Sequence, residues 1–315
     1  MRVFVTRTLP GPALERLREE GLEVEVHQGL LLPREELLKK VEGVVGLIPT
    51  VEDRIDEEVM ERAGPSLKVI ACYSVGVDHV DLEAARKRGI RVTHTPGVLT
   101  EATADLTLAL LLAVARRVVE GVDYARGGRW WAWHPELLLG LDLGGLTLGL
   151  VGMGRIGQAV AKRAEAFGMR VVYHSRTEKP LPYPHLPLDE LLASADILSL
   201  HAPLTPETHR LLNRERLFAM KKGAILINTA RGALVDTEAL VEALDGHLFG
   251  AGLDVTDPEP LPLGHPLLAR KNAVITPHIG SAGRRTRERM AEMAVENLLA
   301  VLKGQEPPNP VAWGP

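Results

Sequence analysis

Short runs of apolar residues alternate along the chain with longer stretches of mixed apolar and polar residues. In the N-terminal third, the apolar runs predict strands at Arg2–Thr6, Val24–Val26, Gly43–Ile48 and Lys68–Ala71. The stretches between them predict helices at Pro12–Glu20, Arg34–Val41 and Glu57–Ala63. Strands that alternate with helices favour a parallel sheet with helices on both faces.

A second series of strands follows a long apolar helix. This helix is predicted over Thr100–Val119, with Thr100 as its N-cap, and the Gly- and Trp-rich stretch Arg126–Leu143 leaves the core after it. The strands of the second series are predicted at Leu146–Val151, Arg170–Tyr173, Ile197–Leu200, Ala224–Asn228, Gly250–Asp254 and Ala273–Thr276. The chain then ends with a predicted helix, Arg284–Leu302, and a Pro-rich tail.

The two series predict an α/β protein of two Rossmann-like, doubly wound parallel-sheet domains with a cleft between them. A chain of 315 residues is also longer than one hydrophobic core usually supports. The first domain is expected to be discontinuous, to comprise residues 1–98 and 285–315, and to bind the substrate. Residues 99–284 are expected to form the dinucleotide-binding domain.

Composition narrows the class of protein. Hydrophobic residues make up 45% of the chain and charged residues 25%, which is typical of a soluble globular enzyme. A net charge of −4 gives no reason to expect nucleic acid or a membrane as partner, and no apolar stretch is long enough to span a bilayer. The single cysteine, Cys72, and the lack of a signal peptide indicate a cytoplasmic location. No metal site is predicted.

A glycine-rich turn of the form G-x-G-x-x-G lies directly between a predicted strand and a predicted helix, Gln158–Phe167. Gly152 permits the tight turn, Gly154 lets the backbone approach a pyrophosphate, and Gly157 allows the helix to pack closely on the strand. Such turns also serve simple packing, but the strand–turn–helix context favours dinucleotide binding. The other residues of this turn are Met153, Arg155 and Ile156.

The end of the next strand indicates which dinucleotide binds. NAD-binding proteins of this fold carry an acidic residue there, which holds the ribose 2′-hydroxyl. This chain instead has Ser175, Arg176 and Thr177. Arg176 could pair with a 2′-phosphate, although an ordinary surface position is the alternative. The sequence therefore predicts a preference for NADPH, with NADH possible.

Three later strand ends carry residues suited to hydride-transfer chemistry, because ligands of such sheets bind at the carboxyl ends of the strands. Arg231 follows one strand and could clamp a carboxylate, although a surface arginine is the ordinary alternative. Asp254, Asp257 and Glu259 lie in a Pro-rich loop after the next strand. His278 follows the third strand, and it is either a structural histidine or the proton donor that reduction of a ketone requires.

At these residues the sequence resembles the D-isomer-specific 2-hydroxyacid dehydrogenases, and within them it is most similar to the glyoxylate and hydroxypyruvate reductases, also called glycerate dehydrogenases. The order and spacing of the matching blocks carry the resemblance, which covers nearly the whole chain. The blocks are Val75–Asp78, Thr95–Gly97, Gly149–Gly157, His201–Thr208, Asn228–Gly232, Gly252–Pro260 and Pro277–Gly280.

The resemblance implies a catalytic triad of Arg231, Glu259 and His278, and it selects Glu259 over Asp257. It also implies that the amides of Val75 and Gly76 hold the substrate carboxylate, together with Arg231 and His278. Further cofactor-binding positions that it implies are Thr103, Pro203, Thr208, Thr229, Ala230, Arg231, Asp254, His278 and Gly280.

The resulting expectation is an oxidoreductase that reduces glyoxylate, hydroxypyruvate or both to glycolate and D-glycerate, with hydride from NADPH or NADH and a proton from His278. One alternative is a related dehydrogenase that acts on formate, D-lactate or a longer keto acid. Another is a nucleotide-sensing corepressor of the same fold, although the chain shows neither an extended disordered tail nor a basic patch.

An aromatic cluster lies in the stretch that leaves the core, at Trp130, Trp131 and Trp133 beside His134. Packing against its own domain is one interpretation. The resemblance implies instead a dimerisation segment in which Trp133 reaches the substrate site of the partner. A homodimer is therefore expected, because a second subunit would cover these apolar side chains.

Overall fold

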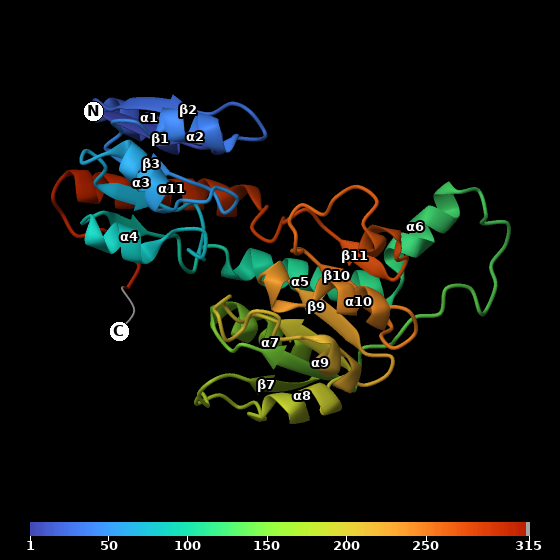
Figure 1. The fold of residues 1–315 in the computed structure, drawn as a ribbon. Coiled ribbons are helices and arrows are strands. Elements are labelled where there is room, and N and C mark those ends of the chain that lie inside the picture. Colours follow the sequence, from blue (N-terminus) through green and yellow to red (C-terminus); the bar gives the residue numbers. More distant parts are fainter. Residues whose placement is uncertain (313–315) are drawn as a thin grey trace. The chain divides into compact units, whose positions relative to one another are not determined.

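The structure is a computed structural model that describes residues 1–312, and it divides the chain into two compact units (Figure 1). The first unit comprises Met1–Leu99 and the segment from Ala282 onward. The second unit is the continuous segment Thr100–Ser281. The first unit is thus discontinuous, and the chain passes from one unit to the other at residues 99/100 and 281/282.

The described part of the first unit contains a five-stranded parallel sheet in the order β2-β1-β3-β4-β5. Its strands are β1 (Arg2–Val5), β2 (Glu23–Val26), β3 (Gly46–Ile48), β4 (Val69–Ala71) and β5 (Arg91–Thr93). Its helices are α1 (Ala13–Glu19), α2 (Arg34–Lys40), α3 (Glu57–Ala63), α4 (Leu82–Lys87) and α11 (Arg284–Leu302).

Alternation along the strands gives this sheet two apolar faces. Val3 and Val5 of β1 pack in one cluster with α1 and α11, whereas Phe4 packs in the other with α2, α3 and α4. Helix α11 therefore returns from the end of the chain to complete the core of the first unit.

Two elements of the first unit were not predicted, namely β5 and the helix α4 that precedes it. Strand β5 has three residues and only Val92 at its centre is strongly apolar, so no apolar run marks it. It pairs with β4 and receives a hydrogen bond from the tail, Val311 N to Val92 O at 2.9 Å. Tertiary pairing, rather than local preference, defines this strand.

The second unit contains, among its described residues, a six-stranded parallel sheet in the order β11-β10-β9-β8-β6-β7. Its strands are β6 (Thr147–Val151), β7 (Arg170–His174), β8 (Ile197–Leu200), β9 (Ile225–Asn228), β10 (Gly250–Leu253) and β11 (Ala273–Ile275). Its helices are α5 (Thr100–Ala115), α6 (Val118–Arg126), α7 (Arg155–Ala166), α8 (Leu188–Ser194), α9 (Arg214–Ala219) and α10 (Thr237–Ala243), with 3₁₀ turns η1 (Gly232–Leu234) and η2 (Pro266–Ala269).

Helices cover both faces of this second sheet. Ile197, Ile225 and Ile227 pack in one cluster with α5 and α7, while Leu198 and Leu226 pack in the other with α8, α9 and α10. The sheet order reverses direction between β6 and β8, so the topological switch point lies beside the end of β6. Both units are thus Rossmann-like, doubly wound α/β folds, as the pattern of strands and helices predicted.

The long helix predicted over Thr100–Val119 ends earlier than predicted, because α5 stops at Ala115. Arg117 adopts a left-handed conformation, with φ of 50°, and this residue separates α5 from α6. Thr100 is the first residue of α5 rather than its N-cap. The apolar composition continues through Val118 and Val119, so hydrophobicity alone could not locate the break.

Residues 117–140, which we call the arm, extend away from the rest of the second unit (Figure 1). No residue of α6 is buried, and Trp130, Trp131 and Trp133 are exposed. The arm closes at its base, where Leu141 N donates to Ala115 O at 2.8 Å. Within residues 1–312, every helix is too short or too polar to span a lipid bilayer.

Candidate active site

The glycine-rich turn lies at the switch point of the second sheet. Gly152 has a φ of +97°, and a Cβ placed on it would lie 2.6 Å from the carbonyl carbon of His201. A Cβ on Gly157 would lie 2.3 Å from Gly152 O, so both positions require glycine. A Cβ on Gly154 would meet no atom within 4 Å, and this open space is where a pyrophosphate could approach the backbone.

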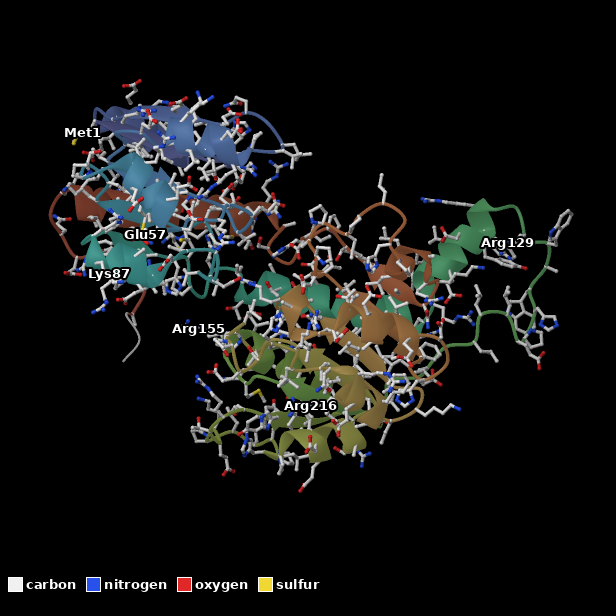
Figure 2. All side chains as sticks on the ribbon, in the orientation of Figure 1. Met1, Glu57, Lys87, Arg129, Arg155 and Arg216 are labelled. Atoms are coloured by element: carbon white, nitrogen blue, oxygen red, sulfur yellow. The ribbon has the colours of Figure 1, made fainter. Side chains whose placement is uncertain are left out.

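Helix α7 begins at Arg155, three residues earlier than the predicted Gln158. Arg155 and Ile156 therefore belong to its first turn, whose amides have no intrahelical acceptor and carry the positive end of the helix dipole. Figure 2 labels Arg155, whose side chain is exposed, at this end of the helix. The turn and the helix end together fit the phosphates of a nicotinamide dinucleotide.

The residues predicted to select the dinucleotide follow β7. The Ser175 hydroxyl donates to Thr177 O at 2.6 Å, and a ring nitrogen of His185 donates to Ser175 O at 2.9 Å. Arg176 is exposed. The pKa of Glu207, in the loop after β8, is lowered mainly by a hydrogen bond with Thr205 and further by the charge of Arg176. Arg176 thus lies within electrostatic reach of that loop.

Pro203 and Thr208 belong to the same loop after β8. The Thr208 hydroxyl donates to Pro203 O at 2.7 Å and accepts from Thr205 N at 2.7 Å. Thr208 therefore shapes the loop through its own backbone contacts. His201, where the loop begins, bonds to Ser199 Oγ at 2.8 Å, and burial lowers its pKa to about 4. His201 is consequently neutral at physiological pH and cannot serve there as a cationic proton donor.

The predicted triad gathers at one edge of the second sheet. Strands β9, β10 and β11 are parallel neighbours, and Arg231, Glu259 and His278 follow their respective carboxyl ends. His278 Nδ1 lies 2.5 Å from Glu259 Oε1, with the two side chains 32% and 30% exposed. Among the contacts within residues 1–312, His278 pairs with Glu259 and not with Asp257.

Charge at this edge favours an ionised Glu259. Burial is the largest single influence on the pKa of Glu259 and would raise it, but the contributions that lower the pKa, led by the hydrogen bond and the charge of His278, together outweigh burial. The amide of Thr256 and the charge of Arg231 act in the same direction. A carboxylate that faces Nδ1 fixes the ring so that Nε2 is the nitrogen available to a substrate.

Gly232 explains how Arg231 reaches this cluster. A Cβ on Gly232 would lie 2.0 Å from the carbonyl of Thr256, so the turn after β9 packs directly against the loop that carries Glu259. The side chain of Asn228 shapes the same turn. Its Nδ2 donates to Arg231 O at 2.8 Å, and its Oδ1 accepts from Ala230 N at 3.0 Å. Neither Gly232 nor Asn228 was predicted as a site residue.

Asp254 holds the turn that carries His278. Its carboxylate accepts from the Thr276 hydroxyl at 2.6 Å and from the amides of Ile279 and Gly280, each at 2.7 Å. His278 N also donates to Asp254 O at 3.0 Å. His278 has a φ of 54°, an uncommon conformation for a residue with a side chain, so these contacts hold the histidine in place.

Helix α5 contributes two threonines to this region. Thr103 Oγ1 donates to Gly280 O at 3.3 Å, and Thr107 Oγ1 lies 2.9 Å from Thr229 Oγ1. The structure thus brings the predicted Thr103, Thr229 and Gly280 to the edge that carries His278. Thr107 was not predicted, although two buried threonines one turn apart on a largely apolar helix were the available signal.

Three further predicted residues belong to other segments of the chain. Val75 and Gly76 lie after β4 in the first unit. Trp133 lies in the arm, where it is 82% exposed. Within residues 1–312, no group of three or more His, Cys, Asp or Glu side chains is arranged to hold a metal ion.

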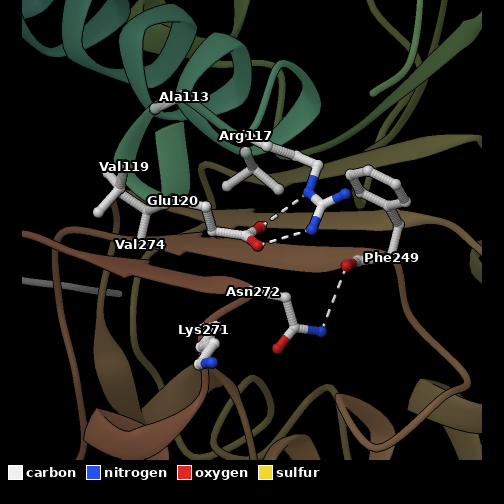
Figure 3. Close-up of a pocket in the computed structure, with 9 residues that line it drawn as sticks. Ala113, Arg117, Val119, Glu120, Phe249, Lys271, Asn272 and Val274 are labelled. Carbon is white, nitrogen blue, oxygen red and sulfur yellow. Dashed lines mark hydrogen bonds and ion pairs between the residues drawn. The ribbon is translucent and has the colours of Figure 1, made fainter. Parts of the chain in front are cut away.

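A cavity of about 300 Å³ lies at the opposite edge of the second sheet, where β10 and β11 begin (Figure 3). Its wall includes an ion pair between Arg117 and Glu120, with Asn272 donating to Phe249 O at 3.2 Å. Because the triad follows the carboxyl ends of the same strands, this cavity is not the candidate active site.

Comparison with known proteins gives consistent matches. The sequence profile of the D-isomer specific 2-hydroxyacid dehydrogenase NAD binding domain matches residues 108–280. The chain is 51% identical over 318 residues to a glyoxylate reductase of Pyrococcus horikoshii, with 98% of this chain and 94% of that protein covered.

Two solved structures extend these matches. The TT0316 protein of Thermus thermophilus is 86% identical, with a TM-score of 0.96 and coverage of 99% of this chain and 100% of that chain. An NADPH-dependent glyoxylate/hydroxypyruvate reductase of Sinorhizobium meliloti, solved with NADP and malonate, is 37% identical. Its TM-score is 0.87, and 99% of this chain and 96% of that chain are covered.

The pairing of Glu259 with His278 predicts a measurable titration. The Glu259 carboxyl should titrate below its ordinary value of 4.5. His278→Phe should raise the midpoint, because it removes the hydrogen bond and the charge that most strongly counteract the effect of burial on the pKa of Glu259. A pKa depressed by folding stabilises the fold above the unfolded pKa, and this contribution is lost as pH falls through the folded value. Carboxyl ¹³C NMR, assigned with Glu259→Gln, measures it.

The matched control is His265→Phe, which removes a histidine 3.8 Å from a different carboxylate, that of Glu238. This variant should leave the Glu259 midpoint unchanged. A Glu259 midpoint that is the same with and without His278 would contradict the pairing.

Proposed function

The chain belongs to the D-isomer specific 2-hydroxyacid dehydrogenase family, and we propose that it reduces glyoxylate and hydroxypyruvate to glycolate and D-glycerate. The observation that carries this proposal is the contact between His278 and Glu259 at the sheet edge where Arg231 also lies. That arrangement suits reduction of a carbonyl that stands beside a carboxylate. Relatives about half identical over nearly their full length are named glyoxylate reductases, which supports the same substrate class.

A bound nicotinamide dinucleotide would supply the hydride at this site. The turn from Gly152 to Ile156 and the N-terminal end of α7 would together bind the phosphates of the dinucleotide. Thr103, Thr229, Ala230 and the His278 turn would face its nicotinamide end, since they gather at the carboxyl edge of the sheet. The NAD-binding profile that matches residues 108–280 supports this use of NAD(P).

Side chains of this protein would then bind the substrate, stabilise the charge that develops on its carbonyl oxygen and donate the proton. Arg231 orients the keto acid through its carboxylate and polarises the carbonyl. His278 gives a proton from Nε2 to the oxygen on which negative charge develops. Glu259 remains ionised and supports the imidazolium through Nδ1. In the first unit, we assign the amides of Val75 and Gly76 to the substrate carboxylate.

The proton-donor role predicts a selective loss of activity. His278→Ala should lower kcat for glyoxylate reduction by about 10²–10⁴-fold, the usual range for removal of a positioned general acid. NADPH binding should change little, because the glycine turn is unaltered. Steady-state kinetics and fluorescence titration with NADPH measure the two quantities. Near-normal turnover in this variant would refute the role of His278.

We propose a preference for NADPH over NADH, with Ser175, Arg176 and Thr177 as the 2′-phosphate site. No carboxylate in this segment repels a phosphate, and the Arg176 guanidinium is exposed and available to it. An NADPH-dependent relative 37% identical supports the proposal.

Two variants test the cofactor preference. Ser175→Asp introduces the carboxylate that would hold a ribose hydroxyl, so the ratio of kcat/KM for NADPH to that for NADH should fall by about tenfold or more. Arg170→Ala serves as the control, because Arg170 lies at the opposite end of β7 and should leave the ratio unchanged. Wild-type enzyme that clearly prefers NADH would overturn the proposal.

We also propose a homodimer held together through the arm. Val118, Val119 and Val122 of α6 are exposed together with the tryptophans, and a second copy of the chain would remove this apolar surface from water. In such a dimer, Trp133 would reach the partner's substrate site. A cytoplasmic location is part of the same proposal, and it suits Cys72, which is a free and buried thiol.

Light scattering tests the assembly. The wild-type chain should show twice the 34.3 kDa mass of one chain, because burying the arm's apolar side chains favours association. The double variant Val119→Asp, Val122→Asp should shift the mass toward a monomer, whereas Leu263→Asp, at a fully exposed leucine outside the arm, should not. A monomeric wild type at working concentration would contradict the proposal.

A further inference from the structure

Three successive carbonyl groups are held in the loop after β4. Ser74 O accepts from Thr95 N at 2.8 Å, Val75 O lies 2.9 Å from His94 Nδ1, and Gly76 O accepts from the Ser74 hydroxyl at 2.7 Å. A carbonyl oxygen can only accept, so His94 Nδ1 carries the proton in this contact. Every carbonyl of this short segment therefore has a defined donor.

The amides of Val75 and Gly76 differ from these carbonyls. Within residues 1–312, neither N–H has a hydrogen-bond acceptor. In a trans peptide, the N–H points opposite to the carbonyl of the preceding residue. Thr95 therefore aims the N–H of Val75, and His94 aims the N–H of Gly76. Because His94 and Thr95 are neighbours, both amides point away from the same segment, as an anion-binding pair would.

His94 is itself held firmly by the end of the chain. Asn297 of α11, fully buried, donates from its side chain to His94 O at 3.0 Å. His94 N donates to Asn309 O at 3.2 Å, and Asn309 N donates to the Asn297 side chain at 3.0 Å. A buried amide whose oxygen and nitrogen are both satisfied gives His94 a fixed backbone from which its ring reaches Val75.

We propose that His94 is a positioning residue for substrate binding, which aims the N–H of Gly76 at the carboxylate of the keto acid. This inference rests on the proposed function, since it takes Val75 and Gly76 as the carboxylate-binding amides. His94 touches neither substrate nor cofactor in this role. It acts by fixing the plane of the peptide between Val75 and Gly76.

Two substitutions at position 94 test the mechanism. His94→Phe keeps a ring and removes the donor, whereas His94→Asn places an amide nitrogen at the position of Nδ1. Loss of one directed hydrogen bond to a carboxylate should raise KM for glyoxylate by about tenfold or more in His94→Phe. The inhibition constant of oxalate should rise by a similar factor, while kcat and KM for NADPH stay within about twofold. His94→Asn should restore both constants.

The matched control is His247→Phe. His247 also bonds through a ring nitrogen to a backbone carbonyl, Met220 O at 3.0 Å, at the opposite edge of the second sheet from the triad. It should change neither KM for glyoxylate nor oxalate inhibition. Thermal melting of each variant shows whether the fold is retained.

The outcomes separate the two proposals. Wild-type enzyme that does not turn over glyoxylate would defeat the proposed function. Active wild type with an unchanged KM in His94→Phe would overturn the positioning role alone. A rise in KM for glyoxylate that is matched by a rise in KM for NADPH and a fall in kcat would overturn it as well. Such a pattern indicates general damage to the enzyme rather than a misdirected amide.

Discussion

The buried carboxylate of Asp254 is the interaction on which the geometry of the candidate site depends. It is 2% exposed at the end of β10, and an ionised carboxylate in that position is costly unless its oxygens are satisfied. Among residues 1–312, the donors to this carboxylate come from the segment after β11, namely the Thr276 hydroxyl and the amides of Ile279 and Gly280. His278 lies between these donors in the sequence, so the hydrogen bonds that satisfy the Asp254 carboxylate also fix the backbone of His278.

The parallel sheet supplies the rest of the site. Neighbouring parallel strands have their carboxyl ends at a common edge of the sheet, so residues far apart in the sequence meet there. The close approach of Gly232 to the Thr256 carbonyl joins the turn after β9 to the loop after β10. Any side chain at Gly232 would separate Arg231 from Glu259. The packing of these two segments thus requires a glycine at position 232.

The sequence was informative where local chemistry determines structure. Apolar runs predicted most strands, and the glycine turn identified the switch point because its spacing reflects backbone geometry. It was uninformative where tertiary contacts decide. The break at Arg117 lies inside a continuous apolar stretch, and β5 exists because β4 and the tail pair with it. Spacing alone could not choose Glu259 over Asp257 as the partner of His278, and family resemblance made that choice.

Asp254 and His94 orient a loop in the same way, one in each unit. In each unit, a side chain satisfies backbone groups on one side of a short loop and so determines what the other side presents. Asp254 accepts from amides and leaves the His278 ring toward the carboxyl edge of the sheet. His94 donates to the carbonyl of Val75, and within residues 1–312 the amide of Gly76 has no acceptor. This arrangement requires that the residue itself be held in place. The end of β10 holds Asp254, and the buried side chain of Asn297 holds the backbone of His94. Buried polar side chains can therefore determine how a neighbouring loop presents its groups, as Asp254 does for the turn of His278 and Asn297 does for His94.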